Sequence, residues 1–215
     1  MNTEIKEVAR RHLAKEGANL SLRGVARDLG IVASALYRYF PSRDALLTAL
    51  IIDAYDALGT AATKAEAAVP RADLRGRWMA VCHAVRTWAL AHPAEYGLIY
   101  GNPVPGYAAP RETTALAQQV VLLLAGIVAE GADRLEPLSA RPLPEPVRVD
   151  LRRLIDDRPG DMPEDRLDRV FVGWTHLFGL VSFEVFGRLN ETLSAHAEYF
   201  DHHMALMADL AGVPR

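Results

Sequence analysis

Apolar residues recur along this chain with the 3.6-residue period of an α-helix, and no run alternates as a half-buried β-strand would. The first clear case is spaced i, i+3, i+4 and i+7: Leu22, Val25, Ala26 and Leu29. The same period returns in four longer segments, at residues 46–58, 74–89, 167–185 and 199–210. The pattern predicts an all-α fold.

Residues that begin and end helices set the boundaries in the first fifty positions. Gly17 closes a first helix, and Ser21 is placed to cap a second. Gly30 ends that second helix, because glycine tolerates the left-handed backbone of a helix C-terminus. Ser42 follows the break at Pro41 and can cap the next helix.

Proline divides the rest of the chain. Pro93 ends the helix that contains Trp78, and six of the 13 prolines lie between residues 137 and 163. The predicted segments after Pro93 are a loop at 101–110, a helix from Val120 to about Asp133, an exposed connection at 137–163 with a short helix near 147–156, and two helices at about 164–188 and 194–211.

Residues 21–47 hold the most informative pattern. They read SLRGVARDLGIVASALYRYFPSRDALL and predict two short amphipathic helices joined at Gly30. The second helix buries Leu36 and Phe40. A helix that starts with small side chains and continues into hydroxyl and guanidinium groups suits end-on entry into the DNA major groove. The small side chains at its start are Ala33, Ser34 and Ala35.

This stretch resembles the helix-turn-helix of the TetR family of transcriptional repressors, over roughly residues 4–50. The matching features are Val25-Ala26, Gly30 at the turn, and the runs Leu36-Tyr37-Arg38-Tyr39-Phe40 and Pro41-Ser42-Arg43-Asp44-Ala45-Leu46-Leu47. A second resemblance, to the family's WHG-type C-terminal domain, rests on Trp174, Phe178-Gly179, Glu184 and Phe186-Gly187. There Phe178 stands where the pattern usually has histidine.

The resemblance implies a three-helix DNA-binding domain at residues 1–47 and a larger helical domain at 48–215 that binds a small molecule and dimerises. Ligand binding would tilt the fourth helix, separate the two DNA-binding domains and release DNA. Tyr37 and Arg43 would contact phosphates. The expected DNA-binding residues are Ser21, Arg23, Val32, Ala33, Ser34, Ala35, Tyr37, Arg38, Tyr39 and Arg43.

Two positions depart from the family pattern. Arg43 stands where lysine is more usual, which keeps the charge but changes the hydrogen-bond geometry. Val32 stands where the family often has serine or threonine. Valine cannot cap a helix, so the recognition helix starts with an unpaired N–H or uses Ser34 instead.

The aromatic residues of the larger domain are compatible with a small-molecule pocket, because such sites have apolar walls with a few polar groups. Plain core packing explains about half of them equally well, and the loop at 101–110 is a candidate ligand entrance. The expected pocket residues are Trp78, Cys82, His83, Trp88, Tyr96, Tyr100, Tyr107, Phe171, Trp174 and Phe178.

The last two helices carry a second apolar set off their main core face. The resemblance implies that these helices pair with those of a second subunit, which would give a four-helix bundle. The expected dimer residues are Phe183, Phe186, His196, Tyr199 and His203. No metal or cofactor is expected, because His196 and His203 are seven residues apart whereas helical ligand pairs are usually three or four apart.

Composition and charge narrow the class. The chain has 215 residues, 50% hydrophobic and 24% charged, as in folded soluble proteins, and its single cysteine excludes a disulfide framework. No signal peptide or membrane span is expected, so we expect a cytoplasmic protein without a membrane partner. The net charge is −3, yet residues 1–50 carry eight Lys/Arg against five Asp/Glu. A basic end on an acidic body favours double-stranded DNA as the partner.

The sequence therefore predicts a homodimeric, ligand-responsive repressor on a near-palindromic operator, released by a small apolar or aromatic effector. Two-fold symmetry predicts half-sites roughly 34–36 Å apart. One alternative is a small-molecule enzyme or carrier that uses the aromatic pocket. The lack of an acid–base or nucleophile cluster in the sequence argues against an enzyme. The other alternative is an activator, or an architectural regulator without a ligand, on the same fold.

Overall fold

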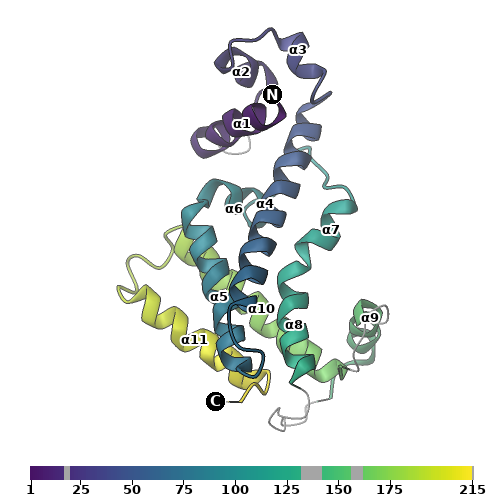
Figure 1. The fold of residues 1–215 in the computed structure, drawn as a ribbon, viewed down its shortest axis with the longest axis vertical. Coiled ribbons are helices and arrows are strands. Elements are labelled where there is room, and N and C mark those ends of the chain that lie inside the picture. The colour runs from purple at the N-terminus through teal and green to yellow at the C-terminus, as the bar shows by residue number, and fades with distance from the viewer. Residues whose placement is uncertain (17–19, 132–141, 156–161, 215) are drawn as a thin grey trace. The chain divides into compact units, whose positions relative to one another are not determined.

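The computed structural model describes residues 1–16, 20–131, 142–155 and 162–214, and these residues form eleven helices and no strand (Figure 1). The all-α prediction is confirmed. The helices are α1 (Asn2–Glu16), α2 (Leu22–Asp28), α3 (Ala33–Tyr37), α4 (Arg43–Ala67), α5 (Leu74–Ala91), α6 (Pro93–Tyr100), α7 (Glu112–Ala117), α8 (Gln119–Glu130), α9 (Glu145–Ile155), α10 (Glu164–Val185) and α11 (His196–Leu210).

Most predicted boundaries lie within two residues of the observed ones. α5 ends just before Pro93, and no helix occurs at 101–110. α8 ends at Glu130, earlier than the predicted end near Asp133. Gly17 and parts of the predicted connection, 137–141 and 156–161, lie outside the described residues.

α6 and α7 were not predicted. α6 has eight residues with Gly97 in its middle, and only Tyr96 among them is buried. α7 has six residues. Segments this short span too few turns for an apolar periodicity to show.

The chain divides into two compact units. The first comprises Met1–Gly59 and Thr87–Ala117, and the second comprises Thr60–Arg86 and Gln118–Arg215. α4 and α5 each continue from one unit into the other. The expected domains, 1–47 and 48–215, were assigned by function and stay a prediction.

The core of the first unit is built from one side of each of its first four helices. α4 is apolar enough by length and composition to cross a membrane, but its Leu46, Leu47 and Leu50 are buried in this core, as in the core helix of a globular protein. The core residues are Ile5, Val8, Ala9, Leu13, Leu20, Leu22, Val25, Ala26, Leu36, Phe40, Leu46, Leu47, Leu50 and Val104.

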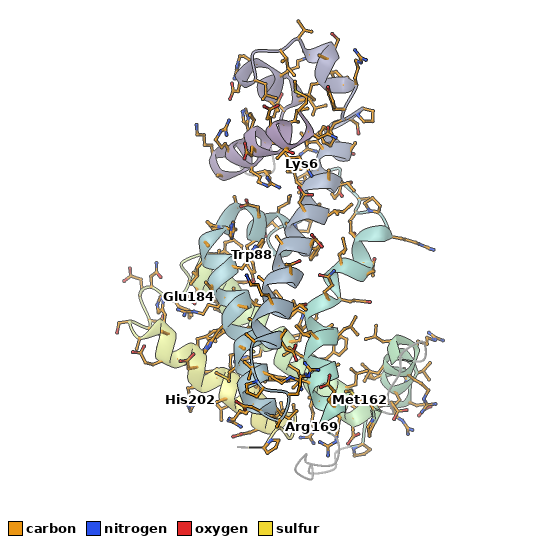
Figure 2. The ribbon with its side chains drawn as sticks, viewed as in Figure 1. Lys6, Trp88, Met162, Arg169, Glu184 and His202 are labelled. Carbon is orange, nitrogen blue, oxygen red and sulfur yellow. The ribbon has the colours of Figure 1, made fainter. Side chains whose placement is uncertain are left out.

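Asp53 of α4 holds α1 in place through two basic side chains. Lys6 Nζ lies 2.7 Å from its Oδ2, and Arg10 Nη2 lies 2.8 Å from the same oxygen; Figure 2 labels Lys6 on α1. Arg10 Nε is also 4.0 Å from Glu95 of α6. Lys6 and Arg10, two basic residues of the N-terminal segment, therefore form ion pairs within the protein.

Trp78 is the centre of packing in the second unit. Its ring is completely buried, and its Nε1–H donates to the carbonyl of Met204 in α11 at 3.2 Å. Gly173 of α10 lies against the ring: a Cβ there would be 3.0 Å from Trp78 Cζ2. Glycine at this position therefore lets α10 approach α5 closely.

A buried ion cluster joins α4, α5 and α8 within the second unit. Glu66 accepts hydrogen bonds from Arg77 Nε and Arg71 Nη1, both at 2.6 Å. Arg77 Nη1 lies 3.0 Å from Glu130. Glu66 and Arg77 are both buried, so removing Glu66 would leave the Arg77 guanidinium without its buried carboxylate partner, which is strongly destabilising.

Candidate nucleic-acid interface

α2 and the turn after it are defined by local hydrogen bonds. Ser21 Oγ accepts from the backbone N–H of Gly24 at 3.4 Å, which confirms the predicted cap. Gly30 has φ +68, the left-handed conformation that glycine adopts without strain. The N–H of Ile31 then donates to the carbonyl of Ala26 at 3.0 Å and closes the corner between α2 and α3.

α3 packs one side against the core and exposes the other. Leu36 is completely buried. Exposed around it are Ser34, Tyr37, Arg38 and Tyr39. Tyr37 and Tyr39 are almost half exposed, which is unusual for large aromatic side chains without a partner surface.

Val32 precedes α3 and makes no side-chain cap, as its chemistry predicted. Its side chain is 70% exposed, the largest value among the large hydrophobic residues that the structure describes. Ala33 and Ala35 beside it are half-buried. The exposed surface at the entrance to α3 is therefore small and apolar.

The start of α4 borders the same surface. Ser42 Oγ accepts from the N–H of Ala45 at 3.0 Å, which is the predicted cap. Arg43 Nε donates to the carbonyl of Leu20 at 3.2 Å, so the side chain links the start of α4 to the residues before α2. This bond holds the Arg43 guanidinium, one-third exposed, in a defined position beside the helix-turn-helix.

The basic residues of the helix-turn-helix differ in what they contact. Arg23 and Arg38 are exposed, and the structure gives neither an ion pair with any residue that it describes. Arg27 lies 3.5 Å from Asp28. Arg23 and Arg38 therefore keep exposed guanidinium groups without a carboxylate partner among the described residues.

His12 and Asp28 join α1 to the end of α2. His12 Nε2 lies 2.7 Å from Asp28 Oδ2, and the histidine ring is buried. This hydrogen bond is the main reason that the pKa of Asp28 lies below its ordinary value. The sequence analysis missed this pair, since the two residues are 16 positions apart and no motif relates them.

The loop at 101–110 contributes to the packing of the first unit. Val104 is buried in the core, and Tyr107 Oη lies 2.9 Å from Thr48 Oγ1 of α4. The sequence suggested a ligand entrance here and Tyr107 as a pocket residue. Tyr107 packs against the core of the first unit, and both the ligand entrance and the pocket role of Tyr107 stay predictions.

The other aromatic residues expected in a pocket from the first unit are largely buried. Trp88 stacks on His92 with ring centroids 5.1 Å apart. Tyr96 is fully buried, and its ring centroid lies 5.2 Å from that of Tyr100. Burial raises the pKa of Tyr100 above its ordinary value, so its hydroxyl stays protonated.

Two of the pocket residues expected in the second unit belong to its core. Trp78 and Cys82 are completely buried, and burial raises the pKa of the Cys82 thiol, which keeps it protonated and unreactive. His83, by contrast, is about half exposed, and its Nε2 lies 2.6 Å from Asp201 of α11.

Phe171, Trp174 and Phe178 form an aromatic cluster along α10. Trp174 meets each phenyl ring edge-on, with centroids 5.7 Å apart in both cases. The Nε1 atom of Trp174 is buried and has no hydrogen-bond partner among the described residues. An unpaired buried donor is rare in proteins.

Two of the expected dimer residues are exposed, and the other three contact residues of their own chain. Phe183 and Phe186 are 48% and 42% exposed. His203 Nδ1 lies 2.9 Å from His176 Nε2, and the Tyr199 ring is 4.2 Å from that of His203. His196 Nε2 lies 2.7 Å from the carbonyl of Leu193, at the start of α11.

Comparison with known proteins identifies the family. A family model described as "Bacterial regulatory proteins, tetR family" matches residues 5–50, and one described as "Tetracyclin repressor-like, C-terminal domain" matches residues 78–207. The chain is 40% identical over 198 residues to the HTH-type transcriptional regulators Rv1816 of Mycobacterium tuberculosis and Mb1846 of Mycobacterium bovis, which covers 87% of this chain and 82% of each relative.

Solved structures agree. The fold is similar to that of the regulatory protein SCO4313, with a TM-score of 0.79, 32% identity, and coverage of 97% of this chain and 95% of that one. It is also similar to the TetR family regulator PfmR of Thermus thermophilus, with a TM-score of 0.63, 18% identity, and coverage of 98% and 99%. With its helix-turn-helix and helical C-terminal domain both matched, the chain belongs to the TetR family of transcriptional regulators, which are DNA-binding proteins and not enzymes.

Proposed function

We propose that this regulator is a repressor that binds a near-palindromic operator as a homodimer and leaves it when a small apolar or aromatic molecule binds. The observation that carries DNA binding at this site is the exposed side of α3, where Tyr37, Arg38 and Tyr39 surround the buried Leu36. In this proposal α3 enters the major groove, and its hydroxyl and guanidinium groups bind flanking phosphates.

The homodimer proposal is supported by an apolar face on α10. Val172, Gly179, Phe183 and Phe186 are all exposed and follow one another at intervals of seven, four and three residues, which places them on one side of the helix. Leu206 adds an exposed apolar side chain on α11, which packs against α10. A second copy of this face would complete a four-helix bundle.

The opposite side of α10 is anchored within its own chain, which supports a preformed dimer face. Glu184, labelled in Figure 2, accepts two hydrogen bonds from Arg86 of α5, at 2.6 and 2.8 Å. The Glu184 carboxylate is also the main reason that the pKa of Arg86 is raised. This bidentate pair fixes the orientation of α10 without help from a partner.

The effector proposal is supported by Trp174. A buried donor without a partner costs about 1–3 kcal/mol, and a ligand with an oxygen acceptor next to its apolar part would recover that energy. Trp174→Phe keeps an aromatic ring and removes the donor. We expect this variant to bind operator normally and to need a higher effector concentration for release.

A reporter assay tests the direction of control. A promoter that carries the bound DNA should be less active when the protein is present and should recover when the effector is added. Higher activity with the protein present would favour the activator alternative. Because its proposed target is DNA, we expect the protein to act in the cytoplasm.

A further inference from the structure

We propose that Val32 reads the 5-methyl group of a thymine in each half-site of the operator. This inference rests on the proposed docking of α3 in the major groove and names the base that its entrance recognises. Two observations support it: the position of the Val32 isopropyl group in the structure, and the chemical groups that base pairs expose in the major groove.

The turn between α2 and α3 directs its two aliphatic residues to opposite sides. Ile31 is half-buried, packs against the core of the first unit and closes the corner through its N–H. Val32 has an extended backbone, φ −70 and ψ 141, and its side chain is 70% exposed. The chain therefore holds one branched apolar group in a fixed position at the entrance to the recognition helix.

Few side chains next to Val32 could read base edges through hydrogen bonds. Ala33 and Ala35 carry only methyl groups, and Ser34 has the single hydroxyl between Val32 and Leu36. After Ser34, the next side chain that can form hydrogen bonds is Tyr37. The first part of the recognition surface is thus suited to apolar contact and poorly suited to hydrogen bonding.

Among the four bases of unmodified DNA, only thymine presents a methyl group in the major groove, at its C5. Other base edges carry donors or acceptors that valine would desolvate without replacing, which disfavours them. Val32 therefore favours thymine in two ways: it contacts the methyl group of thymine, and it disfavours bases whose polar edges it would desolvate.

Removing that methyl group alone tests the inference. Duplexes of the operator recovered by selection would carry deoxyuridine in place of thymine, one position at a time. At one position per half-site, we expect binding to wild-type protein to weaken about fourfold, the value for losing one buried methyl-sized group. An operator with a 5-methylcytosine–guanine pair at that position should bind the protein better than one with an unmethylated cytosine–guanine pair there.

Val32→Ala should remove most of the sensitivity to deoxyuridine at that position. Because the side chain is exposed, the variant should melt at the same temperature as wild type. Val147→Ala, which shortens an exposed valine on α9, is the matched control and should keep the full fourfold effect.

Two results would overturn the inference while leaving the proposed function intact. In one, the protein binds a defined operator but deoxyuridine has no effect at any position. In the other, Val32→Ala stays as sensitive to deoxyuridine as wild type, which would assign the methyl contact to another residue. Failure to select any shared DNA sequence would instead contradict the proposed function itself.

Discussion

Tyr37 lies at the end of α3 and is almost half exposed, and we expect its hydroxyl to contact an operator phosphate. Tyr37→Phe keeps the ring and removes one hydrogen bond to phosphate. We expect operator affinity to fall about fivefold, as for the loss of about 1 kcal/mol. The melting temperature should not change, because the hydroxyl has no partner in the described part of the chain. Fluorescence anisotropy with labelled operator measures the effect, and an unchanged affinity would remove Tyr37 from the interface.

Asp28 predicts how acid affects the DNA-binding domain. Its pKa is lowered in the folded protein, mainly by the hydrogen bond with His12. Asp28 therefore stabilises the fold above its unfolded pKa, which lies near 4, and this contribution is lost as the pH falls through the lower folded pKa.

Thermal unfolding between pH 7 and pH 3 checks this prediction with Asp28→Asn as the control. The variant should melt below wild type at pH 7, and the two melting temperatures should converge toward pH 3. Parallel curves over the whole range would show that the His12–Asp28 pair adds no pH-dependent stability.

Single residues were predictable from sequence where the cause is local. The caps at Ser21 and Ser42 follow from side chains that reach backbone groups three residues away. The pairs His12–Asp28 and Thr48–Tyr107 were not predictable, because they join positions 16 and 59 residues apart. Such contacts depend on how the helices pack, which no short pattern encodes.

At the scale of elements, the α2–α3 turn depends on the backbone of Gly30. A Cβ at Gly30 would meet nothing within 4 Å, so Gly30→Ala tests the φ of +68 alone. We expect a loss of about 1–2 kcal/mol in the free energy of unfolding. Gly126→Ala is the matched control: it also has open space, but it lies within α8 at ordinary helical φ.

In the control variant, the free energy of unfolding should change in the opposite direction. Alanine favours a helix over glycine by up to about 1 kcal/mol, so Gly126→Ala should be neutral or stabilising. Urea unfolding of the two variants gives the comparison. Equal effects at both sites would mean that the turn does not require the left-handed backbone.

Elements were predictable in proportion to their length. α10 and α11 each carry at least four turns of apolar period, and the sequence located both within about three residues. α6 and α7 have eight and six residues and were missed. The sequence predicts the candidate DNA surface from a turn glycine, two caps and a dense run of motif residues, which all lie within 27 consecutive positions.

At the scale of the whole molecule, the α10 face predicts a dimer. Phe183→Glu with Phe186→Glu places two charges on that face, and burying unpaired charges is strongly unfavourable. Sedimentation at micromolar concentration should show a dimer for wild type and a monomer for the double variant. Val147→Glu alters an exposed valine on α9 and should stay dimeric. A wild-type monomer, or a dimeric double variant, would contradict this interface.

The aromatic residues show why the sequence alone does not separate a candidate effector pocket from the core. Core and pocket use the same residue types, so the pattern does not separate Trp78, which is sealed in the core, from Trp174, which keeps an unpaired donor. Only the atoms around each ring distinguish the paired donor of Trp78 from the unpaired donor of Trp174.

The central claim is that the helix-turn-helix recognises a defined DNA sequence. Selection of bound fragments from random DNA, followed by affinity measurement on the recovered duplex with and without 200 mM salt, tests it most directly. The account predicts two related half-sites roughly 34–36 Å apart, with affinity that falls steeply as salt rises. Fragments that share no sequence, or binding of scrambled DNA at the same affinity, would contradict it.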